Sequence, residues 1–195
     1  MTDTSQTRDY RMGKRLDEVA RTRRRIVEAA VELHGSVGPA NTTFSAVADL
    51  AGVQRSTLYR HFPDETALFG ACTSHYMARN PWPAFESWRQ QEEPLARLST
   101  GLTDLYRYYA SNRPMLSNSY RDIEVMPQFV GDMMREQRDS TVAVLAEPFE
   151  AEHEAIASAI SLAVDFRTWT VLDEGGLEPD VAAELMVAMI RGLTP

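Results

Sequence analysis

Cysteine is almost absent from this sequence of 195 residues, because Cys72 is the only one. A chain with a single cysteine forms no internal disulfide, which suits a reducing compartment, and we interpret Cys72 as a small core residue. The sequence also lacks any run approaching the ~18 consecutive apolar residues of a membrane-spanning helix. Its first thirty residues are too charged for the apolar core of a signal peptide. The sequence therefore predicts a cytoplasmic protein.

Signatures of catalysis and of metal binding are missing as well. The four histidines do not follow metal-ligand spacing, and no second cysteine supports a thiolate site. The sequence has no glycine-rich phosphate loop and no nucleophile-elbow motif. These absences argue against an enzyme, and we expect no cofactor.

The net charge of −8 is distributed unevenly along the chain. Residues 1–61 hold ten cationic and seven acidic side chains, a net of +3, whereas the remainder holds ten cationic and 21 acidic side chains, a net of −11. A basic end can lie against DNA phosphates while an acidic remainder is repelled by them. The asymmetry predicts that the N-terminal third contacts nucleic acid.

Residues 42–62 have the pattern of two short helices joined by a tight turn. Thr43 is a suitable N-cap, and Gly52 supplies the backbone freedom that the turn requires. The second helix buries Leu58 and Phe62. The apolar residues of the first helix have helical spacing: Phe44, Val47, Ala48 and Ala51.

The outward residues of the second helix are a dense set of hydrogen-bond donors without an acid. An α-helix fits the major groove of B-form DNA, and the side chains at its N-terminal end reach base edges. Arg55 is the best candidate for a base contact, and Tyr59 and Thr43 for phosphate contacts. The predicted DNA-binding residues are Thr42, Thr43, Gln54, Arg55, Ser56, Thr57, Tyr59, Arg60 and His61.

This segment resembles the signature of TetR-family transcriptional regulators, over roughly residues 20 to 70. The resemblance implies an all-α protein with an N-terminal helix-turn-helix domain of three helices and a larger C-terminal domain that binds an effector and dimerises. The residues that carry the resemblance are Ala48, Ala51-Gly52-Val53 and Arg55-Ser56-Thr57-Leu58-Tyr59-Arg60-His61-Phe62, followed by Asp64 and Ala67-Leu68-Phe69.

Two positions depart from the family pattern. Glu65 stands where the family usually has a lysine that can contact a phosphate, and Gln54 replaces a small hydroxyl residue. An acid cannot make that phosphate contact, whereas glutamine remains a donor and acceptor. The departures leave a second interpretation open, a helical protein-interaction module that has lost specific DNA binding.

The sequence predicts three segments and about nine helices, with no strand. Residues 1–16 are a flexible basic arm, 17–63 the helix-turn-helix DNA-binding domain, and 64–195 the effector-binding and dimerisation domain. In the arm, Arg8, Arg11, Lys14 and Arg15 belong to a disordered tail or reach an adjacent minor groove. The predicted helices cover residues 17–37, 44–51, 54–62, 64–79, 94–111, 115–124, 127–147 and 152–174, and a last one starts at residue 179, with a polar connector before residue 94.

Aromatic residues concentrate in the middle of the chain, where ten of the seventeen lie between Phe69 and Phe129. Methionine and aromatic side chains line adaptable apolar cavities, although a stripe at helical spacing is also typical of an ordinary core. The TetR resemblance implies that this region holds a small, largely apolar effector between helices. The predicted lining residues are Trp88, Tyr106, Tyr109, Tyr120, Met126, Phe129, Met133 and Phe166.

The last two predicted helices are apolar over more of their circumference than one buried face requires. They can form a four-helix bundle with a second copy, and the resemblance implies the same homodimer. Within the first of them, Asp165 and Arg167 are surface charges or polar anchors. Two reading helices on a two-fold axis would address a palindromic operator. We expect a repressor that an effector releases when the helix beginning at Asp64 changes the separation of the reading helices.

Overall fold

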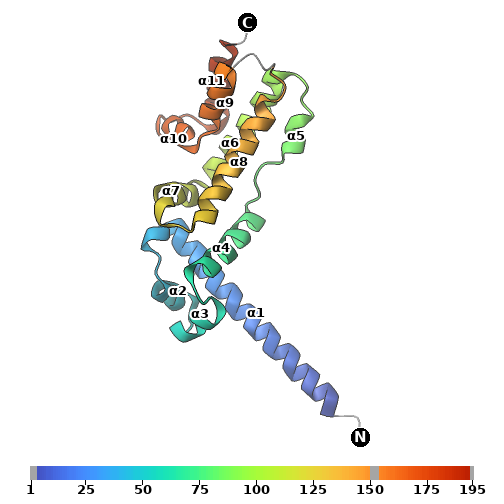
Figure 1. The fold of residues 1–195 in the computed structure, drawn as a ribbon, viewed down its shortest axis with the longest axis vertical. Helices are drawn as coiled ribbons and strands as arrows, with labels where there is room; N and C mark the ends of the chain where they lie inside the picture. Colours follow the sequence, from blue (N-terminus) through green and yellow to red (C-terminus); the bar gives the residue numbers. More distant parts are fainter. Residues whose placement is uncertain (1–3, 150–153, 194–195) are drawn as a thin grey trace. The chain divides into compact units, whose positions relative to one another are not determined.

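The structure is a computed structural model that describes residues 4–149 and 154–193, with side chains from residue 12 onward. All regular structure in this part of the chain is helical, with eleven α-helices and two short 3-10 helices (Figure 1). The helices form two compact units. The first unit contains Met1–Arg79 and Ser117–Pro127, and the second contains Asn80–Leu116 and Gln128–Pro195. The predicted all-α fold is confirmed.

The first unit has one apolar core shared by its four N-terminal helices. α4 packs on α1 and contributes Leu68 and Cys72 to this core, so it belongs to the same compact unit as the helix-turn-helix, whereas the predicted domain boundary lies before it, at residues 63 and 64. The other core residues are Ile26, Val27, Ala29, Ala30, Val47, Ala48, Ala51, Leu58 and Phe62. The elements are α1 (Thr4–Ser36), η1 (Pro39–Asn41), α2 (Phe44–Ala51), α3 (Arg55–His61), α4 (Glu65–Arg79), the C-terminal part of α7 (Arg113–Arg121) and η2 (Ile123–Val125).

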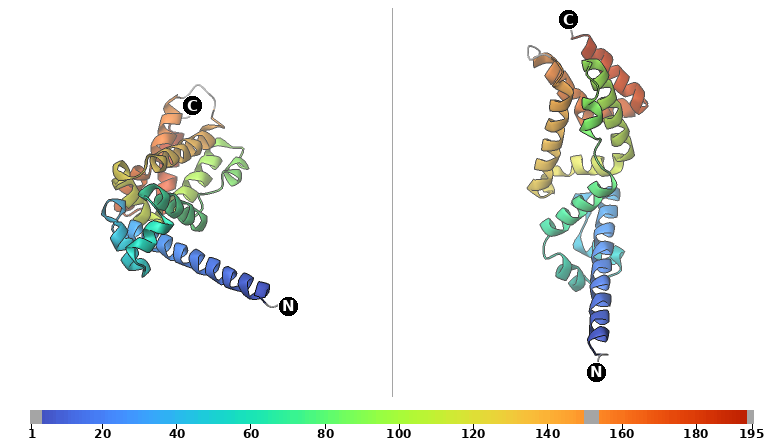
Figure 2. Two further views of the ribbon diagram at one scale, coloured as in Figure 1. Left: turned by 60° about the horizontal axis from the view of Figure 1, so that its bottom comes forward. Right: turned by 90° about the vertical axis from the view of Figure 1, so that its right-hand side faces the viewer.

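The first helix begins earlier than predicted, at Thr4 and not at Asp17. No proline interrupts residues 4–36, and nothing local ends the helix before the glycines near its C-terminus. Residues 4–16, expected as an arm outside the helix, are therefore its first turns. Figures 1 and 2 show these turns running past α2 and α3, and residues 12–21 are exposed. The side chains of Arg8 and Arg11 lie outside the described residues.

The second unit is organised around α6, which packs against five other helices. Pro94 occupies the first turn of α6, and the carboxylate of Glu93 accepts from the amides of Leu95 and Ala96, so the predicted start of this helix is confirmed. The elements are α5 (Phe85–Arg89), α6 (Pro94–Ser111), the N-terminal part of α7, α8 (Gln128–Ala146), α9 (Glu154–Val164), α10 (Phe166–Glu174) and α11 (Pro179–Arg191).

Two differences account for eleven helices where about nine were predicted. α5 forms inside the predicted polar connector, because Trp88 is fully buried and its Nε1 donates to Oδ2 of Asp104 at 3.0 Å. The predicted continuous helix 152–174 is wrong, because Asp165 is extended (φ −67°, ψ 129°) and caps α10 through the amide of Arg167 at 2.8 Å. The predicted start at Glu152 lies outside the described residues.

Within residues 4–149 and 154–193, none of the helices taken singly has both the length and the hydropathy needed to cross a membrane. α9 and α10 reach those values only as a pair that is bent by 62°.

Candidate DNA-binding surface and central aromatic residues

The turn between α2 and α3 has the geometry that the sequence predicts. The hydroxyl of Thr43 accepts from the amide of Ala46 at 3.1 Å, which caps α2. Gly52 ends the helix in the left-handed conformation (φ 64°, ψ 42°), and the amide of Val53 donates to the carbonyl of Ala48 at 3.0 Å. The two helices are therefore joined by a short turn that is hydrogen-bonded to the end of α2.

α3 buries one face and exposes the other. Leu58 and Phe62 are fully buried against the core of the first unit. Thr57 and His61 are half-buried beside them. The exposed residues are Gln54, Arg55, Ser56, Tyr59 and Arg60. The structure thus brings most of the predicted DNA-binding residues together on one polar surface that contains no acid between residues 54 and 62.

Arg55 and Tyr59 are coupled on this surface. Nη2 of Arg55 donates to the hydroxyl of Tyr59 at 3.2 Å, and the guanidinium carbon lies 5.5 Å from the ring centroid. The ring of Tyr59 in turn contacts that of Phe44, with centroids 5.1 Å apart. An arginine restrained in this way loses less rotamer freedom when it binds, and a guanidinium can donate two hydrogen bonds to one guanine.

The surroundings of His61 favour its neutral form. Burial lowers its pKa below 6.5, and the positive charges of Arg60 and Arg23 lower it further. A neutral imidazole has one donor and one acceptor nitrogen. His61 can therefore supply a hydrogen bond to DNA, and the positive charge of α3 comes from its arginines.

Two arginines of α1 contact the residues that end α2 and α3, and the sequence alone did not predict these contacts. Nη2 of Arg25 donates to the carbonyl of Gly52 at 3.1 Å, and the guanidinium of Arg23 lies 4.4 Å from the ring centroid of Phe62. The partner residues are 27 or more positions away in sequence, so no local pattern identifies these contacts. Arg21 is exposed, 3.5 Å from Glu18.

Thr42 and Glu65 lie outside the exposed face of α3. The hydroxyl of Thr42 donates to the carbonyl of Gly38 at 2.8 Å, so this side chain stabilises the segment before α2. Glu65 is exposed in the first turn of α4. Asp64 accepts from the amide of Ala67 at 2.8 Å and caps α4 as predicted. Two carboxylates at this helix start disfavour a phosphate there.

Comparison with known proteins decides the family. The family described as bacterial regulatory proteins, tetR family, matches residues 26–72. The HTH-type transcriptional regulator TtgR of Pseudomonas putida is 30% identical over 184 residues, which cover 91% of this chain and 80% of TtgR. The probable HTH-type transcriptional regulator ArpR, also of Pseudomonas putida, is equally similar, at 30% identity with the same coverage. The chain belongs to the TetR family.

A solved structure has the same fold. A TetR-like transcriptional regulator from Rhodococcus sp. RHA1 superposes with a TM-score of 0.62 at 20% identity, over 88% of this chain and 95% of that one. TetR-family members are transcription factors without enzymatic activity. The protein is thus a DNA-binding transcriptional regulator, and the prediction that it is not an enzyme is confirmed.

Three of the predicted effector-lining residues form a packed group in the second unit. The ring centroids of Tyr106 and Tyr109 are 6.3 Å apart, and that of Phe166 is 5.3 Å from Tyr109. The hydroxyl of Tyr106 donates to the carbonyl of Ala163 at 2.8 Å, and that of Tyr109 to Val164 at 2.7 Å. The two tyrosines therefore pair the last carbonyls of α9, which have no partner within the helix.

The other predicted lining residues are dispersed. Trp88 is fully buried on α5, whereas Phe129 is 37% exposed on α8 and Met133 is half-buried on the same helix. Tyr120 and Met126 belong to the first unit. The structure thus divides the predicted set between the two units.

An open groove between α6 and α11 lies elsewhere in the second unit. Its volume is about 400 Å³, and none of the predicted effector-lining residues lines it. Its charged lining residues are Glu93, Glu184 and Arg191. The remaining lining residues are Leu95, Ala96, Ser99, Val187 and Ala188.

Proposed function

We propose that this TetR-family regulator is a cytoplasmic homodimeric repressor that binds a palindromic operator and is released by a small, largely apolar effector. The observation that carries the proposal is the exposed face of α3, with Arg55, Tyr59 and Arg60, in a segment (residues 54–62) that contains no acid. Such a face suits the major groove, where arginine reads guanine and neighbouring donors hold phosphates.

The C-terminal helices support the homodimer. α11 exposes an apolar stripe at a spacing of four residues, and Leu162 of α9 is also 57% exposed. Apolar residues in this helical register form one ridge, which suits packing against a helix of a second copy. The stripe consists of Val181, Leu185 and Met189, which are 42–58% exposed, and Leu193, just beyond the end of α11, is 46% exposed.

The aromatic residues of the second unit support an apolar effector. Aromatic side chains with a few polar atoms are typical of small-molecule sites, and Tyr106, Tyr109 and Phe166 form an aromatic group in this unit. In the mechanism we propose, the effector binds better to a state in which α4 has shifted and the two reading helices are wrongly spaced for the operator. α4 is the last element of the first unit before the chain enters the second at Asn80.

Selection of bound sequences from a random DNA pool, repeated at two salt concentrations, tests the proposal. A palindrome whose enrichment survives moderate salt supports a specific dimeric regulator, and it provides the site needed to screen for effectors. Binding that disappears uniformly with salt contradicts the operator-binding proposal, because phosphate contacts alone are salt-dependent and carry no sequence preference. That result would favour the protein-interaction module instead.

A further inference from the structure

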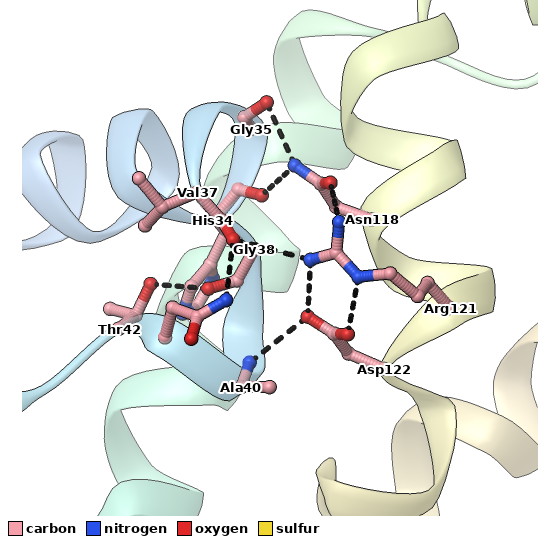
Figure 3. A network of polar contacts seen from close by, with 10 residues as sticks. His34, Gly35, Val37, Gly38, Ala40, Thr42, Asn118, Arg121 and Asp122 are labelled. Atoms are coloured by element: carbon pink, nitrogen blue, oxygen red, sulfur yellow. Dashed lines mark hydrogen bonds and ion pairs between the residues drawn. The ribbon is translucent and has the colours of Figure 1, made fainter.

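Three residues that follow α6 in the sequence hold the segment between α1 and α2. Asn118 and Arg121 lie in α7, and Asp122 follows it; together we call them the α7 clamp. All three belong to the first unit, as does the segment His34–Thr42 that they contact (Figure 3). The contacts join residues that are 82–84 positions apart in the sequence. No helical period or capping pattern predicts them.

Asn118 donates hydrogen bonds to the end of α1. Its Nδ2 donates to the carbonyls of His34 and Gly35, both at 2.9 Å (Figure 3). Nη2 of Arg121 donates to the carbonyl of Val37 at 3.2 Å. The last carbonyls of a helix have no partner within the helix, so Asn118 gives a partner to two carbonyls at the end of α1, and Arg121 to the carbonyl just after it.

Asp122 accepts a hydrogen bond from the next element, η1. Its Oδ2 accepts from the amide of Ala40 in η1 at 3.1 Å. Nε and Nη2 of Arg121 donate to its two carboxylate oxygens at 2.7 and 2.8 Å, while Nη1 donates to Oδ1 of Asn118 at 2.9 Å. Hydrogen bonding by Arg121 lowers the pKa of Asp122, so the carboxylate is charged although only 8% exposed. The three side chains form one connected network.

Gly38 fits this network and admits no larger residue. Its backbone (φ 93°, ψ 159°) lies in a region that is essentially restricted to glycine. A Cβ at this position would collide with Nη2 of Arg121 and Oδ2 of Asp122. The carbonyl of Gly38 accepts from the hydroxyl of Thr42, which directly precedes the N-cap of α2. The clamp is thus connected to the start of α2 through five residues.

We propose that Asn118, Arg121 and Asp122 are positioning residues for DNA recognition, which fix the α1–α2 segment and thereby the placement of α2 and α3 on α1. The inference rests on the proposed operator binding. The clamp acts through the backbone of residues 34–42, and the surface that meets DNA is the exposed face of α3. The reading helix is therefore positioned by a segment that lies between α6 and α8 in the sequence.

Operator affinity of variants that each remove one charge tests this role. We expect Asp122→Asn and Arg121→Gln each to weaken binding to the selected operator about tenfold, since each removes a charged hydrogen bond. The dependence of log Kd on log salt should keep its slope, because neither residue neutralises a phosphate. The double variant should be no weaker than either single variant, because the two side chains act as one pair.

Asp180→Asn is the matched control. It breaks another bidentate pair, in which Nε and Nη2 of Arg107 donate to Asp180 at 2.7 and 2.6 Å in the second unit. This variant should leave operator affinity unchanged. Arg60→Gln is the opposite control, because loss of a phosphate contact should reduce the salt slope by about one. A reduced slope in Asp122→Asn would assign the clamp to DNA contact and overturn the positioning role.

Amide hydrogen exchange of the protein without DNA separates the clamp from operator binding. Asp122→Asn should speed exchange at Ala40 and in the first turn of α2, and Asp180→Asn should not. Unchanged operator affinity of the Asp122 variant, with or without faster exchange, overturns the proposal. If the unmodified protein selects no operator, the proposed function fails. If, in addition, Asp122→Asn leaves amide exchange in residues 37–47 unchanged, the α7 clamp is overturned as well.

Discussion

The guanidinium of Arg55 donates to the hydroxyl of Tyr59 at 3.2 Å and lies over its ring. We predict that Arg55→Ala weakens operator binding by about 1–3 kcal/mol, because a bidentate arginine–guanine contact contributes that much discrimination. The variant should lose its preference at one base pair of each half-site. Titration of single-base operator variants by fluorescence anisotropy measures it.

Arg55→Lys and Tyr59→Phe are the controls for this prediction. Lysine retains the charge but not the planar fork, so Arg55→Lys should keep the salt dependence and lose most of the base preference. Tyr59→Phe keeps the ring under Arg55 and removes one hydroxyl. If alanine at both positions left operator affinity unchanged in a folded dimer, α3 would not be the reading helix.

His34 should make the first unit less stable in mild acid. Its ring is 6% exposed and stacks on Phe69 of α4 with centroids 4.8 Å apart. Burial lowers the pKa of His34 from 6.5 to about 4. The folded state binds the proton less well than the unfolded chain, so this stability is fully present above pH 6.5 and is lost as the pH falls towards 4.

Urea unfolding at pH 7.5 and pH 5 measures this loss, which we expect to be about 2 kcal/mol. Glutamine has no ionisable side chain, so His34→Gln removes the titrating group at this position. The variant should therefore lose less stability than the unmodified protein over the same interval. Equal losses in the two proteins would show that other groups cause the acid sensitivity.

Local signals predicted the helix-turn-helix because caps, glycine and proline act on their immediate neighbours. Thr43 and Gly52 have their predicted roles at the two ends of α2, and Pro94 has its predicted role at the start of α6. α5 was missed because its five residues are too few for a helical period. The break at Asp165 was missed because apolar residues continue on both sides of it.

The sequence predicted the exposed face of α3 but not what holds it. The contact of Arg25 with Gly52 and those of the α7 clamp join distant segments, which only the folded chain brings together. The aromatic set was harder to interpret, because a residue such as Tyr106 has the same helical spacing in a packed core as in a ligand site. Its hydroxyl pairs the carbonyl of Ala163, which no pattern of apolar residues predicts.

Tyr106→Phe should destabilise the second unit. The carbonyl of Ala163 would lose its hydrogen bond in a fully buried position, which costs about 1–3 kcal/mol. Tyr108→Phe is a matched control on the same helix, because Tyr108 is half-buried with its ring 4.8 Å from that of Trp82. Thermal unfolding measures the stability of the two variants. Equal stability would contradict the stabilising hydrogen bond from Tyr106 to Ala163.

The first turns of α1 should contribute phosphate contacts outside the reading helix. Lys14 and Arg15 are exposed in the first half of α1. The N-terminal turns of this helix extend beyond α2 and α3 (Figure 2). We predict that Lys14→Gln with Arg15→Gln weakens operator binding and lowers the salt slope by about one to two, with the base preference unchanged. An unchanged slope would show that this end of α1 lies away from the DNA.

Leu185 and Met189 should hold the dimer together. They are 42% and 58% exposed on neighbouring turns of α11, and a glutamate at each would place two charges in an apolar interface. We predict that the double variant Leu185→Glu with Met189→Glu is monomeric by sedimentation at concentrations at which the unmodified protein is dimeric. It should also bind the palindrome no better than a single half-site.

Val125→Glu controls for the added charge, because Val125 is 64% exposed in the first unit, away from α11 in the sequence. This variant should remain dimeric. A palindrome binds a dimer more tightly than a monomer because the second half-site is then engaged within one complex. If the double variant stayed dimeric and kept its operator affinity, the apolar stripe of α11 would not be the dimer interface, and another surface would have to pair the two reading helices.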